Sequence, residues 1–307
     1  MWTLAALKNT MRPKISVVMM GVLLVIMGCN QPESVELIDT NAGSQIIEVR
    51  SIDPASDPLL LLPSVDTSGL AGTGIPLGMV NITGVRYDGQ APGDSFLHAE
   101  AAFVDTTSPL VDINRVVAYR SLDAGTLRVN DDTLARISRE VLTSQSAVPR
   151  LVGYLYRFNG PYSYQPGVLY TWAGSGSGQM GSFEITIAPG PSIRVLELAP
   201  GTISPGFPLT VRWACDNPEV KIIISRDGES AQRPWVPLLV LRVKNRAGGC
   251  VIPAKILGIL PVDRFGRFLL SFVSEVQFTT SISGYPGSVL VRAASIHNKL
   301  LNVRAPF

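Results

Sequence analysis

The sequence contains very little histidine: only His98 and His297 occur in 307 residues. A zinc site usually takes three or four histidine, cysteine or carboxylate ligands, and a Ser–His–Asp centre needs a histidine beside its nucleophile. No G-x-S-x-G elbow is present. His98 and Glu100 would share one face of a strand, but a half-exposed strand explains the pair more simply than a metal site does. We therefore expect no metal, no cofactor and no catalytic centre.

Charged residues are also scarce, at 16% of the chain. Three of the 26 basic side chains and none of the 24 acidic ones lie in residues 1–28, so the remainder carries 23 basic and 24 acidic side chains. Nucleic-acid binding needs clustered basic residues, and this near-neutral balance argues against such a partner. Few charges, 28 glycines and 23 prolines favour an all-β extracytoplasmic protein.

The apolar run near the start, Ile15–Met27, is too short to cross a membrane, because a spanning helix needs about 20 residues. Three basic residues precede it and the first acidic residue follows it, which is the pattern of a secretory signal peptide. Translation could begin at Met1 or at Met11.

The run ends in Ile26-Met27-Gly28-Cys29, which resembles the lipobox of bacterial lipoproteins. The resemblance implies cleavage before Cys29, acylation of its thiol and attachment of the mature chain to a lipid bilayer. Two or three acyl chains make a stable anchor, since each buried CH₂ contributes about 0.8 kcal/mol. In Gram-negative bacteria an aspartate after the cysteine is the common signal for retention in the inner membrane, so Asn30 favours the outer membrane if the host is Gram-negative. The alternative is an ordinary signal peptide with a cysteine there by chance.

Beyond the signal (1–28), we expect a tether and irregular segment (29–78), a first domain (79–190) and a second domain (191–307). Residues 30–45 are polar and suit a flexible tether, and prolines and glycines interrupt residues 53–78. A proline-glycine-proline stretch at 189–191 marks the boundary between the domains. The expected strands are 46–52, 80–88, 95–105, 111–121, 151–159, 167–175, 182–189, 192–199, 208–215, 220–227, 237–245, 267–280 and 288–296. The apolar spacing predicts one helix over 131–142 and a helical turn after Pro253.

Six or seven short strands separated by turns are typical of a β-sandwich. By this strand pattern, residues 190–307 resemble immunoglobulin-like or fibronectin-type-III-like modules of bacterial envelope proteins. The cysteines and the tryptophan depart from the antibody spacing. We expect an all-β fold with two tandem immunoglobulin-like β-sandwich domains after the signal peptide and flexible tether. Trp213, two residues before Cys215, should face the core.

With Cys29 acylated, Cys215 and Cys250 remain. An even pair of cysteines in an oxidising compartment predicts a disulfide. Two separate buried thiols are the alternative.

Aromatic residues cluster between residues 154 and 172. Tyr154, Tyr156 and Phe158 would share one strand face, and Tyr170 and Trp172 another, so we expect cross-strand packing in the core. Tyr162 and Tyr164 lie in a proline-bracketed loop, where an exposed pair could bind a partner.

Two further motifs have structural explanations. Gly176, Gly178 and Gly181 match G-x-G-x-x-G, but an alternating strand pattern follows instead of a helix, so a hairpin loop is expected. Asn130, Asp131 and Asp132 with Asp112 lack the calcium-loop spacing, and helix capping is the simpler role.

These features predict a membrane-anchored envelope lipoprotein that acts as a non-catalytic binding or assembly module for an envelope protein or glycan. The alternatives are a hydrolase of envelope polymers, with a site made from scattered carboxylates, and a structural spacer.

Overall fold

A computed structural model of the chain describes residues 36–40, 45–51, 78–88, 95–112, 115–144, 146–158, 162–204, 206–230, 233–244, 248–261 and 266–303. The expected signal peptide, Cys29 and all but the last residue of the irregular segment 53–78 lie outside these ranges. Within the described ranges, no helix is long and apolar enough to cross a membrane.

The described residues form an all-β structure with several sheets. The first strands are β1 (Glu36–Thr40), β2 (Gln45–Ser51), β3 (Gly78–Tyr87), β4 (Phe96–Asp112), β5 (Arg115–Ser121), β6 (Leu127–Val129), β7 (Asp132–Thr133), β8 (Ala135–Thr143), β9 (Ser146–Arg157) and β10 (Tyr162–Ser163). The later elements are β11 (Tyr170–Gly174), β12 (Phe183–Ile187), β13 (Arg194–Ala199), β14 (Thr202–Ile203), β15 (Leu209–Ala214), β16 (Glu219–Ser230), β17 (Arg233–Lys244), β18 (Gly249–Ile252), α2 (Ala254–Leu257), β19 (Arg267–Ser281) and β20 (Ser288–Val303).

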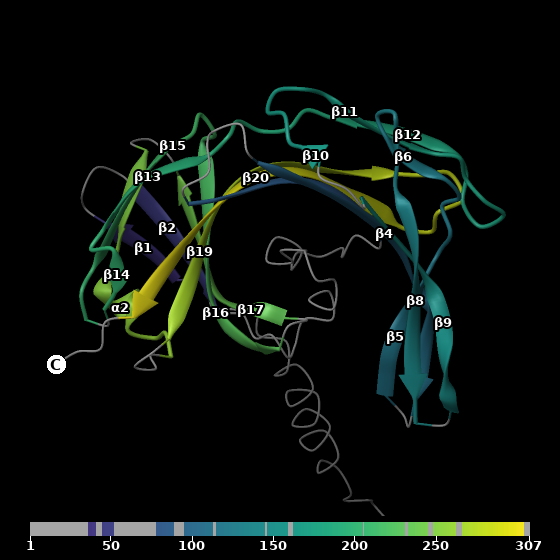
Figure 1. The fold of residues 1–307 in the computed structure, drawn as a ribbon, viewed down its shortest axis with the longest axis horizontal. Helices are drawn as coiled ribbons and strands as arrows, with labels where there is room; N and C mark the ends of the chain where they lie inside the picture. The colour runs from purple at the N-terminus through teal and green to yellow at the C-terminus, as the bar shows by residue number, and fades with distance from the viewer. Residues whose placement is uncertain are drawn as a thin grey trace, which may run out of the picture. The chain divides into compact units, whose positions relative to one another are not determined.

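One large sheet links the two halves of the chain. Ten of its strands follow the order β1-β2-β17-β16-β19-β20-β3-β4-β9-β8, and Figure 1 shows β20 beside β19 and above β4. β20 pairs in parallel with β3, from Val289 opposite Gly78 to Asn298 opposite Tyr87. The sheet thus continues across the expected boundary near residue 190.

The first core lies between this sheet and a smaller sheet of order β12-β11-β6-β7. The small sheet contributes Leu127, Trp172 and Ile185, while Val80 and Ala101 come from the large sheet. Side chains alternate along a strand, so Val80 and Ile82 of β3 and Ala99, Ala101 and Phe103 of β4 face this core. Residues of β20 complete it, namely Val289, Val291 and Ala293.

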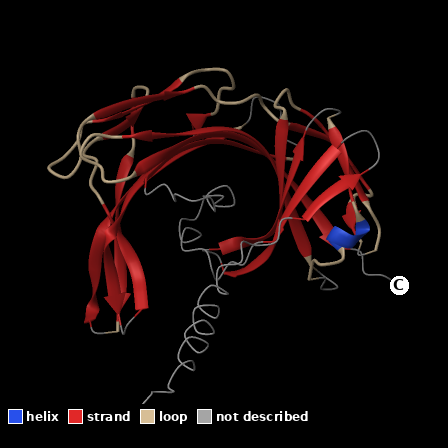
Figure 2. Cartoon of the chain, turned by 180° about the vertical axis from the view of Figure 1, so that it is seen from behind, coloured by secondary structure: helices blue, strands red, loops and turns tan. Residues whose placement is uncertain are grey.

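The second core lies between the other end of the large sheet and the three strands β13-β15-β18. Trp213 is 2% exposed, as expected, and its ring lies 6.2 Å from that of Phe272. Most other members are aliphatic, including Val211, Ile222 and Leu241. Figure 2 shows the predominance of strands, with the short helix α2 in blue.

The expected helix over 131–142 is wrong, because these residues form β7 and β8. The spacing of Leu134, Ile137 and Val141 does match a helix face. However, β8 pairs with β9 from Ala135 opposite Arg157 to Thr143 opposite Ser146. These sheet hydrogen bonds to a neighbouring strand override the weak local preference.

Most other predictions about local structure agree with the structure. Each expected strand range overlaps a strand of the structure, and α2 follows Pro253 as predicted. Residues 36–40, expected to be part of a flexible tether, instead form β1, which pairs with β2.

Candidate functional site

A row of polar side chains crosses the large sheet on the face opposite the first core. The row consists of Gln277, Arg292, Asn81, Glu100 and Arg157, each opposite the next on a neighbouring strand. Asn81 and Glu100 are 0% exposed and Arg292 is 2% exposed. We call this side of the sheet the polar face.

Glu100 holds one end of this row. Its carboxylate accepts hydrogen bonds from Arg157 Nη2 at 3.2 Å and lies 3.0 Å from His98 Nε2. His98 and Glu100 therefore share a face, as the sequence predicted. Among the described residues, no group of three or more histidine, cysteine or acidic side chains could hold a metal ion.

A cavity of about 520 Å³ opens at the other end of the row. Its polar lining includes Asn217, Glu219, Lys221, Arg242, Glu275 and Gln277. The volume is within the usual range for small-molecule sites, about 300–1,000 Å³. The cavity is therefore the candidate ligand site.

Two of the cavity carboxylates, those of Glu275 and Glu219, lie next to cations. Glu275 forms ion pairs with Lys221 and with Arg292 Nε, the latter at 2.8 Å. Glu219 lies 4.0 Å from Arg242 Nη1. Carboxylates paired in this way resemble structural ion pairs.

His297 is buried on β20, where that strand meets β3 and β13. Its Nδ1 accepts hydrogen bonds from Val195 N at 2.9 Å and from Arg86 Nη2 at 3.1 Å. Burial, and then the charges of Arg86 and Lys299, lower the pKa of His297 to about 4. The ring is therefore neutral at pH 7 and joins β13 to the large sheet.

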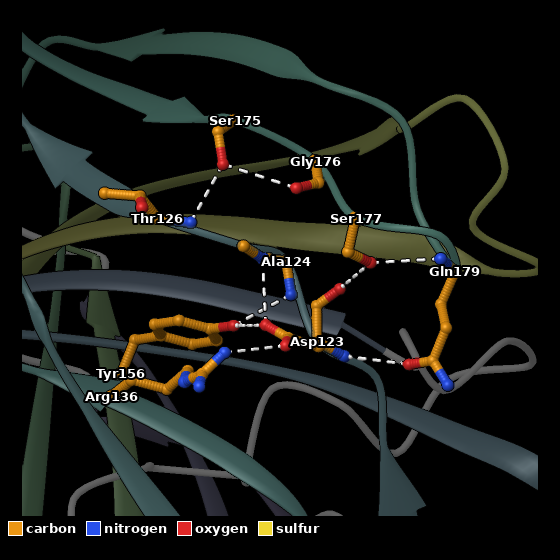
Figure 3. Close-up of polar contacts among 10 residues, drawn as sticks. Asp123, Ala124, Thr126, Arg136, Tyr156, Ser175, Gly176, Ser177 and Gln179 are labelled. Carbon is orange, nitrogen blue, oxygen red and sulfur yellow. Dashed lines mark hydrogen bonds and ion pairs between the residues drawn. The ribbon is translucent and has the colours of Figure 1, made fainter.

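Asp123 organises the loops above the first core, as Figure 3 shows. Its carboxylate accepts hydrogen bonds from Tyr156 Oη at 2.6 Å and Arg136 Nη1 at 2.7 Å. Its backbone oxygen accepts from Ser177 Oγ, and its backbone nitrogen donates to Gln179 Oε1. Burial and the hydrogen bond to Asp123 raise the pKa of Tyr156, which keeps its hydroxyl a donor.

This Asp123 network explains the G-x-G-x-x-G match. Gly176, Gly178 and Gly181 lie in the hairpin loop between β11 and β12, as predicted. Gly176 has a φ of +77°, and an added Cβ would lie 2.7 Å from Ser182 N. Gly176 thus allows the loop to pack tightly beside Asp123.

The remaining polar motif also has a structural role. Asn130 lies in the β6–β7 turn with a φ of +52°, which asparagine tolerates, and its Oδ1 accepts from Thr171 N. The expected helix cap at Asp131 or Asp132 is wrong because strands flank this turn.

Tyr164 is not the exposed anchor that the sequence predicted, because its side chain is only 4% exposed. Its ring stacks on that of Tyr170 with centroids 6.1 Å apart. It also covers Gly84 of β3, where an added Cβ would lie 2.3 Å from the ring. Tyr162 lies on β10, opposite Leu97, and its side chain is outside what the structure describes.

The other clustered aromatics belong to the first core, as predicted. Tyr156, Phe158, Tyr170 and Trp172 are buried, and Tyr154 packs against them. The binding interpretation of the cluster is therefore not supported for its described side chains.

The predicted disulfide is not formed: among the described residues, Cys215 and Cys250 are both thiols. Cys250 pairs with Val211 across β15 and β18, and Cys215 follows Val211 by four positions. At about 3.3 Å per residue, this register separates the two cysteines by about 13 Å along the strand. A disulfide needs Cα atoms within about 7 Å. Burial raises the pKa of Cys250 to about 12.

Two antiparallel hairpins carry a patch that the sequence did not reveal. We call residues 104–121 and 135–153 the distal hairpins; they include β5, β8 and parts of β4 and β9, and β5, β8 and β9 are labelled together in Figure 1. Their exposed aliphatic residues are Val111, Ile137, Leu142, Val148 and Leu151, which are 36–72% exposed.

The ends of the distal hairpins are joined. The Asp112 carboxylate accepts hydrogen bonds from the nitrogen and hydroxyl of Ser144, at 2.5 and 2.6 Å. This places Val111 of one hairpin near the β8–β9 turn, which Leu142 and Val148 flank. Apolar residues beside a tight turn were the available sequence signal, but their exposure depends on the tertiary structure.

No protein-family model and no curated protein matches the sequence. Among solved structures, the crystal structure of murine CEACAM1b is similar over 75% of this chain and 100% of that chain, with 11% identity and a TM-score of 0.15. A similarity at that score adds nothing to the description of the fold.

Proposed function

We propose that the chain is a lipid-anchored protein of the bacterial envelope that holds a partner protein through its distal hairpins, without catalysis. The anchor would be Cys29, on the resemblance of residues 26–29 to a lipobox, and Asn30 favours the outer membrane. The two cores would correspond to two immunoglobulin-like sandwich domains, 79–190 and 191–307, with β20 of the second extending into the first. In support, each core lies between a small sheet and the large one.

The aliphatic patch on the distal hairpins carries this proposal. Exposed apolar surface can mark an interaction site on a soluble protein, and Leu142 and Val148, which flank the β8–β9 turn, are 66% and 72% exposed. The hydrogen bonds of Asp112 with Ser144 hold the two hairpins together, so little order would be lost on binding.

The test uses a photocrosslinking residue at position 148 in cells that produce the full chain. We expect one discrete crosslinked product, which Leu142→Asp reduces at least tenfold. Position 196 is the matched control, because Leu196 is also an exposed aliphatic residue, 56% exposed, but lies on β13. Equal crosslinking from both positions, or no effect of Leu142→Asp, would overturn the proposal.

The anchor is tested separately with Cys29→Ser. We expect loss of the acyl mass and release of the mature chain from the detergent phase. Unchanged processing and partitioning would show that Cys29 is not acylated.

A further inference from the structure

The last part of β19 has one free side in the large sheet. β16 pairs with β19 only from Phe268 to Val273. Among the described strands, β20 alone pairs with β19 beyond that point. We call residues 276–281 the β19 edge. An open edge of a sheet presents backbone donors and acceptors that can pair with another strand.

One hydrogen bond shows which backbone groups face the free side. Glu275 O accepts from Asn217 Nδ2, and Asn217 precedes β16, which lies on the side of β19 away from β20. Backbone groups alternate in direction from one residue of a strand to the next, and the pairing of β19 with β20 has no bulge. The N–H and C=O groups of Gln277 and Thr279 therefore point away from β20.

The β19 edge lacks the features that usually protect an edge strand. It contains no charged residue and no proline, and proteins use both to block pairing at such edges. Val276 and Phe278 are 39% and 40% exposed. They lie opposite Ala293 and Val291 of β20, which belong to the first core. The apolar face of this core thus continues onto the β19 edge, where it is partly exposed.

A second copy of the same edge complements it. In an antiparallel pair related by a twofold axis at Phe278, the two Phe278 side chains lie opposite each other. Gln277 of one copy lies opposite Thr279 of the other, so both residues form ladder hydrogen bonds. No like charges oppose each other, and Glu275, whose carbonyl already accepts a bond, lies outside the paired residues 276–280.

We propose that the chain forms a homodimer in which the β19 edges of two copies pair as antiparallel strands centred on Phe278. The pairing covers Val276 and Phe278 and supplies partners for the backbone groups of Gln277 and Thr279. The inference goes beyond the proposed function, because it concerns a different surface from the distal hairpins and a second copy instead of another protein.

The test places a cysteine at position 278 and measures disulfide formation between two copies. Residues that face each other in this way have Cα atoms about 4.5 Å apart, and a disulfide needs Cα atoms within about 7 Å. Membranes from cells that produce full-length Phe278→Cys are treated with copper phenanthroline, which oxidises thiols, and the proteins are separated on a non-reducing gel. We expect a product of twice the mass of the chain that reductant removes. The parent chain controls for the native cysteines.

Position 276 is the matched control, because Val276 lies on the same face of β19 and is almost equally exposed. In the proposed register, the two copies of residue 276 lie about 13 Å apart along the strand, which is too far for a disulfide. We expect at least tenfold less crosslinking from Val276→Cys. Equal crosslinking from both positions, no crosslinking from position 278, or a product that joins the chain to another protein would overturn the proposal.

A proline tests the hydrogen bonds between the two edges. Thr279→Pro, added to Phe278→Cys, removes an N–H group that points away from β20, so the melting temperature should stay the same while crosslinking falls at least tenfold. Thr279→Ala keeps this N–H group and should crosslink as Phe278→Cys alone does. Equal crosslinking in the proline and alanine variants would show that the edges do not pair through their backbones. The comparison of positions 276 and 278 needs neither variant, and no result here depends on crosslinking by the distal hairpins.

Discussion

The two cores are built on the same plan but with different chemistry. Each contains a buried tryptophan, Trp172 in the first and Trp213 in the second. The second core is otherwise mostly aliphatic, whereas the first contains the buried tyrosines Tyr156, Tyr164, Tyr170 and Tyr285.

The tyrosines of the first core connect it to the surrounding backbone. Tyr156 Oη donates to Asp123, Tyr285 Oη donates to Val104 O at 2.8 Å, and Tyr170 Oη accepts from Gln165 N. Burial raises the pKa of all three hydroxyls. The comparison shows that one core is stabilised mainly by apolar packing, while the other also positions loops through hydrogen bonds at its edge.

The largest expected effect tests whether the cores are independent. Trp213→Ala should lower the free energy of unfolding by about 3–5 kcal/mol, because it leaves a large cavity. β19 contributes Phe272 to the second core, and its neighbour β20 contributes Val291 to the first. Because neighbouring strands of one sheet take part in both cores, the cores should unfold together. Urea denaturation should therefore still show one transition, at a lower urea concentration. Phe207→Ala, at a side chain that is 63% exposed, is the control. Two transitions, one of them unshifted, would show that the cores unfold separately.

A smaller effect on stability is expected from the protonation of His297, which lies on β20, a strand that contributes to both cores. Its pKa is about 4 in the folded chain and about 6.5 when unfolded, so between these values the unfolded chain binds the extra proton. The neutral His297 ring therefore contributes fully to stability above about pH 6.5. This contribution to the free energy of unfolding is at most about 3 kcal/mol; it falls as the pH is lowered toward 4 and is lost below pH 4.

The measurement compares the parent chain with His297→Asn by urea unfolding between pH 4 and 7. The difference in unfolding free energy between them should shrink as the pH falls. A constant difference would mean that the ring does not remain neutral between β3 and β13.

The sequence predicted these cores unevenly. Alternating apolar residues located β3, β15 and β20, because a period of two is a local property. It could not predict that β20 would pair with β3, which brings Arg86 and His297 together from 211 positions apart. The helix predicted over 131–142 failed for the same reason, since the partner strand β9 decides the conformation.

The candidate site was predicted less well than the fold. Polar residues within apolar strands, such as Asn81 and Arg292, were visible in the sequence, but their alignment depends on strand register. Tyr164 looked exposed because it lies between prolines, and only Gly84 on a distant strand leaves space for its ring. The even cysteine pair suggested a disulfide, which the register of β15 with β18 prevents.

Removing the Tyr156 hydroxyl from the first core should cause the next largest loss of stability. Tyr156→Phe leaves the Asp123 carboxylate and Ala124 N, which donates to Tyr156 Oη at 2.8 Å, without that partner. We expect a loss of about 1–3 kcal/mol and faster proteolysis of the loop at residues 175–182, measured by urea unfolding and limited digestion. An unchanged stability would mean that Asp123 does not depend on Tyr156.

Tyr164→Phe should have the smallest effect on the free energy of unfolding, and it should not lower the stability as the other substitutions do. Tyr164 Oη is buried without a hydrogen-bond partner among the described residues, and burial raises the pKa of this hydroxyl. Phenylalanine keeps the stacking on Tyr170 and the contact with Gly84, while it removes an unsatisfied polar atom. Because an unpaired buried polar group is destabilising, the variant should be as stable as the parent or more stable by up to about 1 kcal/mol. Tyr156→Phe, the same substitution at a hydroxyl with partners, is the matched control, and a clear loss of stability at Tyr164 would show that its hydroxyl also holds a loop in place.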